Sequence, residues 1–534
     1  MPTDRTVMMG ETSSGMQKIV TLTGEGHQEI AIHSPVTQFG SVLVENLTPI
    51  FQSDAVYGIN PSEVLTTTGI NGAGSTSGTI TGTNNLFKCS TGTTALSFAS
   101  LQSRKRLRYR AGQGSLCRFT SVFSTPAADS TLVAGLGTAE SGFYFGYNGT
   151  VFGILHVTGG VREIQTLTIT TASTATNNYV VTLNDKVFNI TATSNSSTVK
   201  TAYEIASGVY TGWKAEQRGS TVVFVSDSSG VKSGVFSLAQ TGAVTPAAGS
   251  FVEANAGVAT TDTWYPQTEW NGDVCDGSNS TNNRSGFNLN PLFGNVYQIG
   301  VQYLGFGPVK FQIEKPITGN NSEFIDVHVI NFPNTQTSTS VNQPSFPFTM
   351  AAYSAGSTTN VYVASGSFAG FIEGEIRLTG PRMTFNKETN GFVGSAASTY
   401  YPFFTFRNDL IHGHSITERA NQSVVNLISI SASHDDATPL TFYIIRNATL
   451  LGTPNFIKFS TESCMYWDND ATTCTIPANG NIIFAFTLGQ GGGGAFAFQD
   501  ILTVQPGETI TLAARAVTGT ATYAIASINT REDQ

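Results

Sequence analysis

Apolar and polar residues alternate along residues 295–331, which read NVYQIGVQYLGFGPVKFQIEKPITGNNSEFIDVHVIN. The apolar positions fall at every second residue in three runs, 297–303, 309–313 and 325–329, separated by turns rich in Gly and Pro. A period of two places one set of side chains on one face of a strand. The stretch therefore predicts a three-stranded antiparallel meander with one polar face.

The same alternation recurs elsewhere along the chain. Asn148-Gly149, between FYFGY and TVFGIL, is the strongest hairpin signal. After residue 398, six alternating runs are divided by turns rich in Gly, Pro and Asn: 424–429, 440–445, 482–488, 501–504, 509–514 and 521–528. That number of strands suits a separate β-sandwich or jelly roll.

Helical spacing is convincing at one place, residues 198–209, where Val199, Ala202, Ala206 and Val209 would share a face. Strands are expected before it, at 179–183 and 187–191 around an Asn184-Asp185 turn, and after it, at 221–226. Together they predict a small β-β-α-β module, inserted into a sandwich whose strands continue on both sides.

These patterns predict an all-β chain of several β-sandwich or jelly-roll domains with one inserted β-β-α-β module. Residues 1–62 would form an arm with short strands such as 28–32 and 41–44. The tract at 63–84, rich in Gly, Thr and Ser, would be a linker. A lectin-like β-sandwich would comprise 85–163 and 241–397, interrupted by the module at 164–240. Residues 398–534 would form the C-terminal sandwich.

Composition agrees with this organisation, since 12% of the 534 residues are charged and 55 are glycine. The net charge of −9 argues against nucleic-acid binding. We expect no membrane insertion, because no apolar run approaches the length of a span. The N-terminus lacks the basic start and apolar core of a signal peptide, so a Sec export route is not expected. The composition nevertheless resembles that of surface proteins. Synthesis in a host cytoplasm, followed by release on a particle, would reconcile that composition with the missing export signal.

The charged and thiol side chains leave alternatives open. Residues 104–110 (RKRLRYR) form a cationic cluster. This cluster could meet an acidic partner or a phosphate, but a solvated strand edge that discourages aggregation is the commoner role. The five cysteines contain no CxxC pair, and reduced, buried thiols are favoured. Cys464 and Cys474 flank a short loop and could pair under oxidation.

Two clusters are candidate sites. Trp270, Asp273 and Asp276, with Glu269 nearby, could form a glycan site from carboxylates beside an aromatic ring, although a polar turn above a core tryptophan is the simpler interpretation. His412 and His414 would share a face of a strand, and three copies around a trimer axis would supply six nitrogens to a transition metal. Two exposed loop histidines are the alternative. No catalytic motif is present, so we expect no enzyme and otherwise no cofactor.

Several segments resemble a family of large virion structural proteins of tailed bacteriophages, the tail-fibre and head-fibre proteins. They include SRKRLRYRAGQGSLCRFTSVF, GFYFGYNGTVFGIL, TEWNGD, NVYQIGVQYLGFGPVKFQIE, ASGSFAGFIEG, PLTFYIIRNATL and LTVQPGETITLAARA. The module at 164–240 is similar to one that recurs in phage structural proteins. The resemblance covers most of the chain beyond about residue 30 and carries no functional residue with it.

The resemblance implies a component of the virion, assembled in the host cytoplasm. With the patterns above, it favours a homotrimeric fibre or appendage whose residues 1–62 dock on other virion proteins. Exposed sandwiches would serve host attachment if their outward loops bind a surface glycan. One alternative is a capsid decoration or tail-assembly protein without a receptor role. Another is a polysaccharide-degrading tailspike, which would need paired carboxylates on a shared groove. A long solenoid repeat would favour that enzyme, and the sequence shows no such period.

Overall fold

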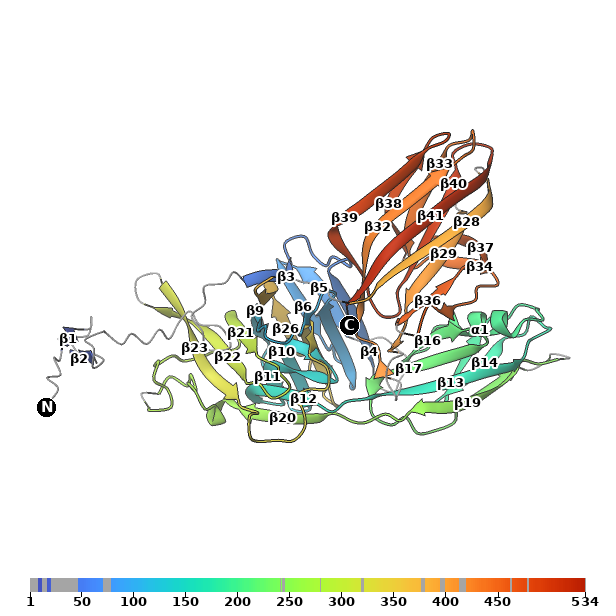
Figure 1. The fold of residues 1–534 in the computed structure, drawn as a ribbon. Helices are drawn as coiled ribbons and strands as arrows, with labels where there is room; N and C mark the ends of the chain where they lie inside the picture. Colours follow the sequence, from blue (N-terminus) through green and yellow to red (C-terminus); the bar gives the residue numbers. More distant parts are fainter. Residues whose placement is uncertain are drawn as a thin grey trace.

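The computed structural model describes residues 8–11, 17–20, 47–70, 78–240, 242, 245–278, 280–317, 321–375, 380–393, 399–412, 419–461, 463–477 and 480–533. These residues form three β units, which we call the first sandwich, the inserted module and the C-terminal sandwich (Figure 1). One α-helix occurs in this part of the chain. The prediction of a multi-domain all-β fold is confirmed.

The first sandwich is built from two antiparallel sheets. One sheet has, in spatial order, β20 (Thr261–Pro266), β12 (Val151–Thr158), β11 (Ser141–Asn148), β10 (Ser130–Thr138), β25 (Phe348–Ser354), β7 (Ser97–Ser103) and β4 (Val64–Ile70). The other has β23 (Asn321–Ile330), β22 (Val309–Ile317), β21 (Asn295–Val301), β9 (Ser115–Phe123), β26 (Tyr362–Ser365), β6 (Leu86–Ser90) and β5 (Thr79–Thr83). Two further strands extend the second sheet beside β9: β27 (Ser367–Glu373) and β3 (Leu47–Asp54).

Aromatic rings from both sheets fill the space between them. Tyr297 of β21 is fully buried, with its ring centroid 4.8 Å from that of Phe145 on β11 and 5.7 Å from that of Phe119 on β9. Such ring pairs contribute roughly 0.5–1.5 kcal/mol each beyond the burial of their area. The alternation in the sequence therefore marks the strands whose inward side chains build this core.

The predicted meander is confirmed as β21, β22 and β23, which pair in succession. One detail differs, because Phe311 pairs with His328 while Gln312 pairs with Asp326, so Val327 is an extra residue in a bulge. The bulge turns His328 inward, where it is 4% exposed, and leaves Val329 partly exposed. Burial lowers the pKa of His328 to about 4, so this imidazole is neutral at physiological pH.

The predicted arm and linker are corrected where the structure describes them. β3 pairs with β27, β4 pairs with β7 and β5 pairs with β6, so residues 47–54, 64–70 and 79–83 are strands of the first sandwich. The linker was predicted from the Gly, Thr and Ser content of residues 63–84. Threonine, however, is β-branched and favours strands. The strands expected at 28–32 and 41–44 lie outside the described residues. A short hairpin of β1 (Met8–Glu11) and β2 (Gln17–Val20) precedes them.

The Asn148-Gly149 hairpin is present. β11 and β12 pair from Gly142 with Val157 to Asn148 with Val151, which leaves Gly149 and Thr150 as a two-residue turn. Gly149 has a φ of 57°, in the left-handed region that favours glycine. β11 places Phe143 and Phe145 in the core.

The inserted module is larger than predicted. Its elements are β16 (Trp213–Arg218), β17 (Thr221–Ser229), β13 (Arg162–Thr171) and β19 (Ala248–Asn255) in one sheet, β15 (Lys186–Ile190), β14 (Tyr179–Leu183) and β18 (Ser237–Gln240) in another, and α1 (Thr198–Ala206). β13 pairs with both β17 and β19, so the module continues to Asn255 and does not end at 240. The Asn184-Asp185 turn is confirmed, with φ values of 50° and 62°.

The helix begins as predicted and ends earlier. Ser197 caps α1, since its hydroxyl accepts a hydrogen bond from the Lys200 backbone N–H at 3.3 Å. Ala202 and Ile205 are buried against the module's sheets. Val209, expected on the same face, lies beyond the helix end and is 88% exposed.

The C-terminal sandwich also has two sheets. One contains β28 (Arg382–Val393), β41 (Thr520–Asp533), β32 (Val424–His434) and β39 (Gly493–Val504). The other contains β35 (Ile457–Lys458), β36 (Met465–Asp468), β29 (Tyr401–Asn408), β40 (Thr509–Ala516), β33 (Leu440–Arg446) and β38 (Asn481–Leu488). Because β28 pairs along β41, this unit begins near residue 382 and not at 398. The strand was missed because its central residues are mostly polar.

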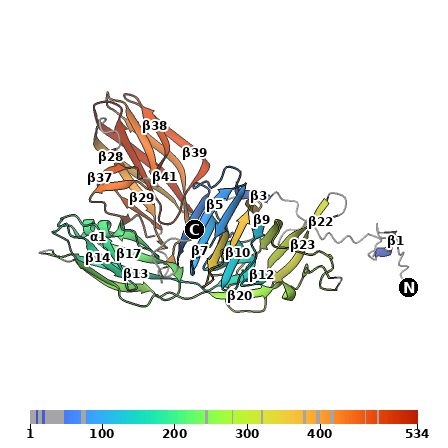
Figure 2. The same cartoon turned by 180° about the vertical axis from the view of Figure 1, so that it is seen from behind.

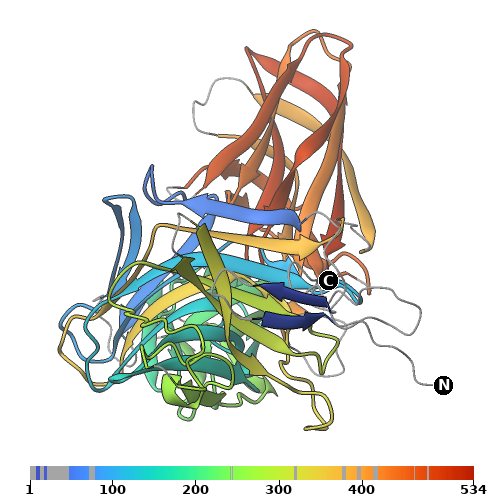
Figure 3. The same ribbon diagram turned by 90° about the vertical axis from the view of Figure 1, so that its left-hand side faces the viewer.

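The remaining elements are short pairs: β8 (Leu107–Arg108) with β24 (Ser345–Phe346), β30 (Ile411–His412) with β31 (Arg419–Ala420) and β34 (Thr449–Gly452) with β37 (Ala471–Thr475), and the 3₁₀ turn η1 (Gln267–Glu269). The C-terminal sandwich stands above the inserted module and beside the first sandwich (Figures 1 and 2). Figure 3 shows the same unit rising over the strands of the first sandwich. No helix among the described residues is long and apolar enough to cross a membrane.

Candidate functional site

Trp270, predicted to offer an aromatic platform, is part of the core. It is 4% exposed, and its ring centroid lies 6.2 Å from those of Phe145 and Phe152. Its Nε1–H donates a hydrogen bond to the backbone oxygen of Tyr265 at 3.2 Å. The ring and its polar atom are therefore both engaged within the first sandwich.

The two predicted carboxylates shape the loop that follows. Asp273 is 6% exposed and accepts hydrogen bonds from the backbone N–H groups of Cys275, at 2.9 Å, and Ser285, at 2.7 Å. Exposed Asp276 accepts from the backbone of Ser278 at 2.8 Å and from the Asn283 amide at 3.0 Å. Hydrogen bonds from Ser278 are the main cause of a lowered pKa at Asp276. This geometry accounts for both residues as loop-forming groups, and ligand binding by them stays a prediction.

The histidine pair is divided by the limits of the described chain. His412 ends β30, is partly buried and pairs with Arg419 of β31, whereas His414 lies outside the described residues. Across the part of the chain that is described, no group of three or more His, Cys, Asp or Glu side chains is placed to hold a metal ion. The axial metal site stays a prediction.

Residues 104–110, which we call the basic segment, lie at a junction between the first and C-terminal sandwiches. The Arg104 guanidinium is 2.6 Å from the Glu508 carboxylate, and Asp533 lies 3.3 Å from Arg108 and 3.5 Å from Arg110. All of these side chains are at most 18% exposed. The solvated-edge interpretation is therefore wrong for these arginines, whose acidic partners belong to the same chain.

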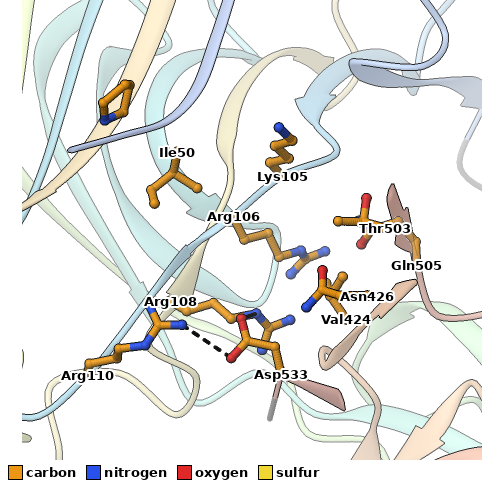
Figure 4. Close-up of a pocket in the computed structure, with 11 residues that line it drawn as sticks. Ile50, Lys105, Arg106, Arg108, Arg110, Val424, Asn426, Thr503, Gln505 and Asp533 are labelled. Carbon is orange, nitrogen blue, oxygen red and sulfur yellow. Dashed lines mark hydrogen bonds and ion pairs between the residues drawn. The ribbon is translucent and has the colours of Figure 1, made fainter. Parts of the chain in front are cut away.

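A cavity of about 130 Å³ opens at this first junction (Figure 4). One side of the cavity is lined by the basic side chains of Lys105, Arg106, Arg108 and Arg110. The other side is lined by residues at the ends of β32, β39 and β41, namely Val424, Asn426, Thr503, Gln505 and Asp533. Pro49 and Ile50 of β3 complete the wall. Arg106 reaches from its segment toward Asn426 and Gln505. The cavity thus holds four cationic residues and one carboxylate.

Arg106 has weaker compensation than its neighbours. Its Nη1 donates to the Gln422 side-chain oxygen at 3.2 Å, while its buried Nε has no hydrogen-bond partner. No carboxylate of the described chain forms an ion pair with it. Burial, together with repulsion from Arg108, lowers the pKa of Arg106 to about 10, so it stays charged at neutral pH.

A second junction joins the inserted module to the C-terminal sandwich through buried charges. Arg407 lies 3.4 Å from Glu216 and 3.1 Å from Asp409, and Asp409 also pairs with Arg218. Glu216 accepts a hydrogen bond from the Leu410 backbone N–H at 2.8 Å. Glu216 and Arg218 come from β16, whereas Arg407 and Asp409 lie at the end of β29. The four side chains connect the two units directly.

Two aromatic rings complete the second junction. The Arg407 guanidinium lies 4.5 Å from the Phe456 ring centroid, and that of Arg218 lies 4.9 Å from the Tyr466 ring centroid. Burial, and then repulsion from Asp409, raise the pKa of Glu216 well above its ordinary value. Burial opposes ionisation of Asp409 too, but Arg218, a hydrogen bond from Glu216 and Arg407 lower its pKa. The two carboxyl groups are therefore coupled, and Asp409 ionises more readily than Glu216.

A groove of about 560 Å³ runs beside this junction, between the end of α1 and the C-terminal sandwich. Tyr203 of α1 lines it and donates a hydrogen bond to the Leu450 backbone oxygen at 3.3 Å. Sequence analysis missed the junction. The available signal was a pair of opposite charges two residues apart in each strand, Glu216 with Arg218 and Arg407 with Asp409, which places each pair on one face.

One side of the C-terminal sandwich is open, with β38 and β39 as its edge (Figure 1). In the described chain, β38 pairs with β33 alone and β39 with β32 alone. Residues 481–498 read NIIFAFTLGQGGGGAFAF and carry no charge. Ile482 is 40% exposed and Phe496 is 36% exposed. We call these two strands the open edge.

All five cysteines are buried free thiols, as predicted. Cys464 lies 2.9 Å from the Ser423 hydroxyl and 3.2 Å from Glu532, and it is not bonded to Cys474. Burial, with the nearby charge of Glu532, raises the pKa of Cys464 to about 12. Such a thiol is protonated and a weak nucleophile at neutral pH.

Comparisons with known proteins identify no family for this chain. No model of a known protein family matches the chain, and a search of the curated proteins finds no similar sequence.

Proposed function

We propose that this protein is a structural component of a bacteriophage virion, a homo-oligomeric and most simply trimeric fibre or appendage exposed on the particle. Its role is assembly and not catalysis. The observation that carries the proposal is the open edge of the C-terminal sandwich.

The open edge has the properties of a surface that another chain covers. Its strands leave a row of backbone N–H and C=O groups unpaired along each sheet, and natural proteins protect such rows with charges, prolines or covering segments. Residues 481–498 contain neither a charge nor a proline. Phe484 and Phe496, whose ring centroids are 5.5 Å apart, lie partly exposed between the two sheets. A second copy of the chain would cover both the backbone groups and the rings.

The other parts of the chain have a place in this proposal. Because β3 belongs to the first sandwich, residues 1–46 remain for docking on other virion proteins. The sandwiches would then be exposed, and their outward loops could contact a glycan of the host surface. The particle, assembled in the host cytoplasm, would be the site of the mature protein.

The mass of the purified protein in solution tests the assembly. Light scattering should give a multiple of the 56.6 kDa chain, with a trimer expected. Phe496→Lys, which places a charge on the open edge, should shift the population toward monomer. Val151→Lys is the matched control, because Val151 is 51% exposed at a hairpin turn of the first sandwich. A wild-type monomer would contradict self-assembly and favour a decoration or tail-assembly protein that joins a preformed lattice.

A further inference from the structure

We propose that the cavity at the first junction binds a small anion through its negatively charged oxygens, with Arg106 as the principal contact. The ligand is either a free phosphate ion or the carboxylate of an acidic sugar. The proposal concerns one chain and does not depend on the oligomeric state.

Charge is the first argument. In a chain of net charge −9, this cavity brings together Lys105, Arg106, Arg108 and Arg110 around a single acid, Asp533. Asp533 already contacts two of the arginines, Arg108 and Arg110. The positive charge of Arg106 is thus left without a paired carboxylate, and a partly buried guanidinium favours an oxyanion.

Glu140 does not supply the missing charge. It attracts Arg106 at longer range, but its carboxylate lies 2.7 Å from Arg162, which it neutralises. Arg162 itself repels Arg106. Glu140 therefore does not compensate the charge of Arg106.

Unmet hydrogen-bonding groups give the second, independent argument. The Arg106 Nε–H has no acceptor, and the Gln505 side-chain oxygen has no donor, although Gln505 is 4% exposed and its Nε2 donates to the Arg104 backbone oxygen at 2.7 Å. Buried polar atoms rarely remain unpaired. A ligand with a negative oxygen for Arg106 and a hydroxyl for Gln505 would pair both atoms. Hydrogen phosphate and an acidic sugar each offer that combination.

Size and shape limit the ligand to a small one. A cavity of about 130 Å³ has room for a phosphate ion or one sugar unit. Ile50 and Val424 provide an apolar part of the wall, which can contact the carbon face of a sugar. Because the two walls belong to different sandwiches, a bound anion would also join them across the first junction.

Isothermal titration of the full-length protein tests the proposal with defined probes. Sodium phosphate and sodium glucuronate are titrated separately, with glucose as the neutral match for glucuronate and sodium chloride at equal ionic strength as the salt control. Saturable binding of phosphate identifies the free ion, and binding of glucuronate without phosphate identifies an acidic sugar. Glucose and chloride should give no saturable heat.

Variants then locate the site. Arg106→Gln should weaken binding at least about tenfold, because it removes a charged hydrogen-bond donor. Arg284→Gln makes the same charge change on an exposed loop and should bind as the wild type does. If Arg106→Gln fails to fold, Lys105→Gln, at an exposed position that lines the cavity, should still weaken binding measurably. The proposal is overturned if neither probe binds, or if the cavity variants bind as tightly as Arg284→Gln.

Discussion

The two junctions of the C-terminal sandwich use arginine in different ways. At the second junction, Arg407 and Arg218 face two carboxyl groups and two aromatic rings, and the side chains of Glu216 and Asp409 are at most 5% exposed. At the first junction, four basic residues face one carboxylate around a cavity. The second junction is closed and internally compensated, whereas the first has spare positive charge and space.

This difference separates two purposes of a buried charge. Desolvated charges that compensate one another fix the relative position of two units, and the loss of one partner leaves the other uncompensated. A buried charge without a partner opposes folding, so its presence is better explained by a ligand that pairs with it. The comparison can be tested by removing one arginine at a time, since the loss of Arg407 should destabilise the protein and the loss of Arg106 should not.

The largest effect is expected from Arg407→Leu. This substitution removes the group that contacts both Glu216 and Asp409 and that lies over the Phe456 ring. Breaking a buried ion pair by removing one partner costs about 3–5 kcal/mol. Denaturant unfolding should show that loss in the transition that includes the C-terminal sandwich.

Arg284→Leu is the control for that substitution, since Arg284 is exposed on a loop of the first sandwich. Its effect should stay within about 0.5 kcal/mol. An Arg407→Leu protein as stable as this control would contradict the view that the second junction depends on compensated charge.

A smaller effect is expected from Arg104→Gln at the first junction. Arg104 and Glu508 are 15% and 13% exposed, and their contact of 2.6 Å is the shortest ion pair of the basic segment. Loss of a charged hydrogen bond at such a partly buried position should cost about 1–2 kcal/mol. The double variant with Glu508→Gln should cost less than the sum of the two single changes, and strict additivity would show that the pair is not coupled.

These contacts show where sequence analysis succeeds and where it ends. Strands such as β21 and β22 were predictable because a period of two is a local property of a half-buried strand. The bulge at Val327 was not, because the register of β23 is set by its partner β22. The sequence of β4 and β5 predicts a linker because their threonines and glycines show no apolar alternation. Their pairing with β7 and β6, which decides their structure, is a tertiary contact.

Candidate sites were harder to predict than strands. The sequence indicates that Trp270 and the basic segment are unusual. Trp270 lies in the core of the first sandwich, and the basic segment lies at the first junction. The contacts of such residues could not be predicted, because they join distant parts of the chain. Arg104 pairs with Glu508, and at the second junction Arg407 pairs with Glu216. Tertiary contacts decide whether a charged side chain has an oppositely charged partner, and the sequence does not reveal those contacts.

The pH dependence of stability sharpens the comparison at the second junction. The raised pKa of Glu216 means that the folded protein keeps a proton which the unfolded chain loses above roughly pH 4.3. The folded state then binds more protons, so this residue makes stability fall as pH rises from that value toward its raised pKa. The lowered pKa of Asp409 acts in the opposite sense, with stability lost as pH falls below roughly 3.9.

Glu216→Gln removes the contribution of Glu216 to the pH dependence of stability, because glutamine is uncharged at every pH. The glutamine side chain can still accept a hydrogen bond from the Leu410 backbone N–H and donate one to Asp409. The difference in melting temperature, variant minus wild type, should increase as pH rises above roughly 4.3. Glu269→Gln, on an exposed turn, is the control and should show no such trend. A difference for Glu216→Gln that is constant with pH would contradict the raised pKa of Glu216.

The smallest change in stability is expected from Arg106→Leu, measured without phosphate or acidic sugars. Arg106 has no carboxylate partner, so its removal leaves no buried acid uncompensated and relieves repulsion from Arg108. The substitution forfeits one hydrogen bond to Gln422, at 3.2 Å, and gains apolar contact near Ile50 and Val424. Replacing a buried charge by an apolar side chain is often neutral or stabilising, so the free energy of unfolding should change by less than about 0.5 kcal/mol or increase. A loss as large as that of Arg407→Leu would mean that Arg106 is compensated in the native protein, and the distinction between the junctions would fail.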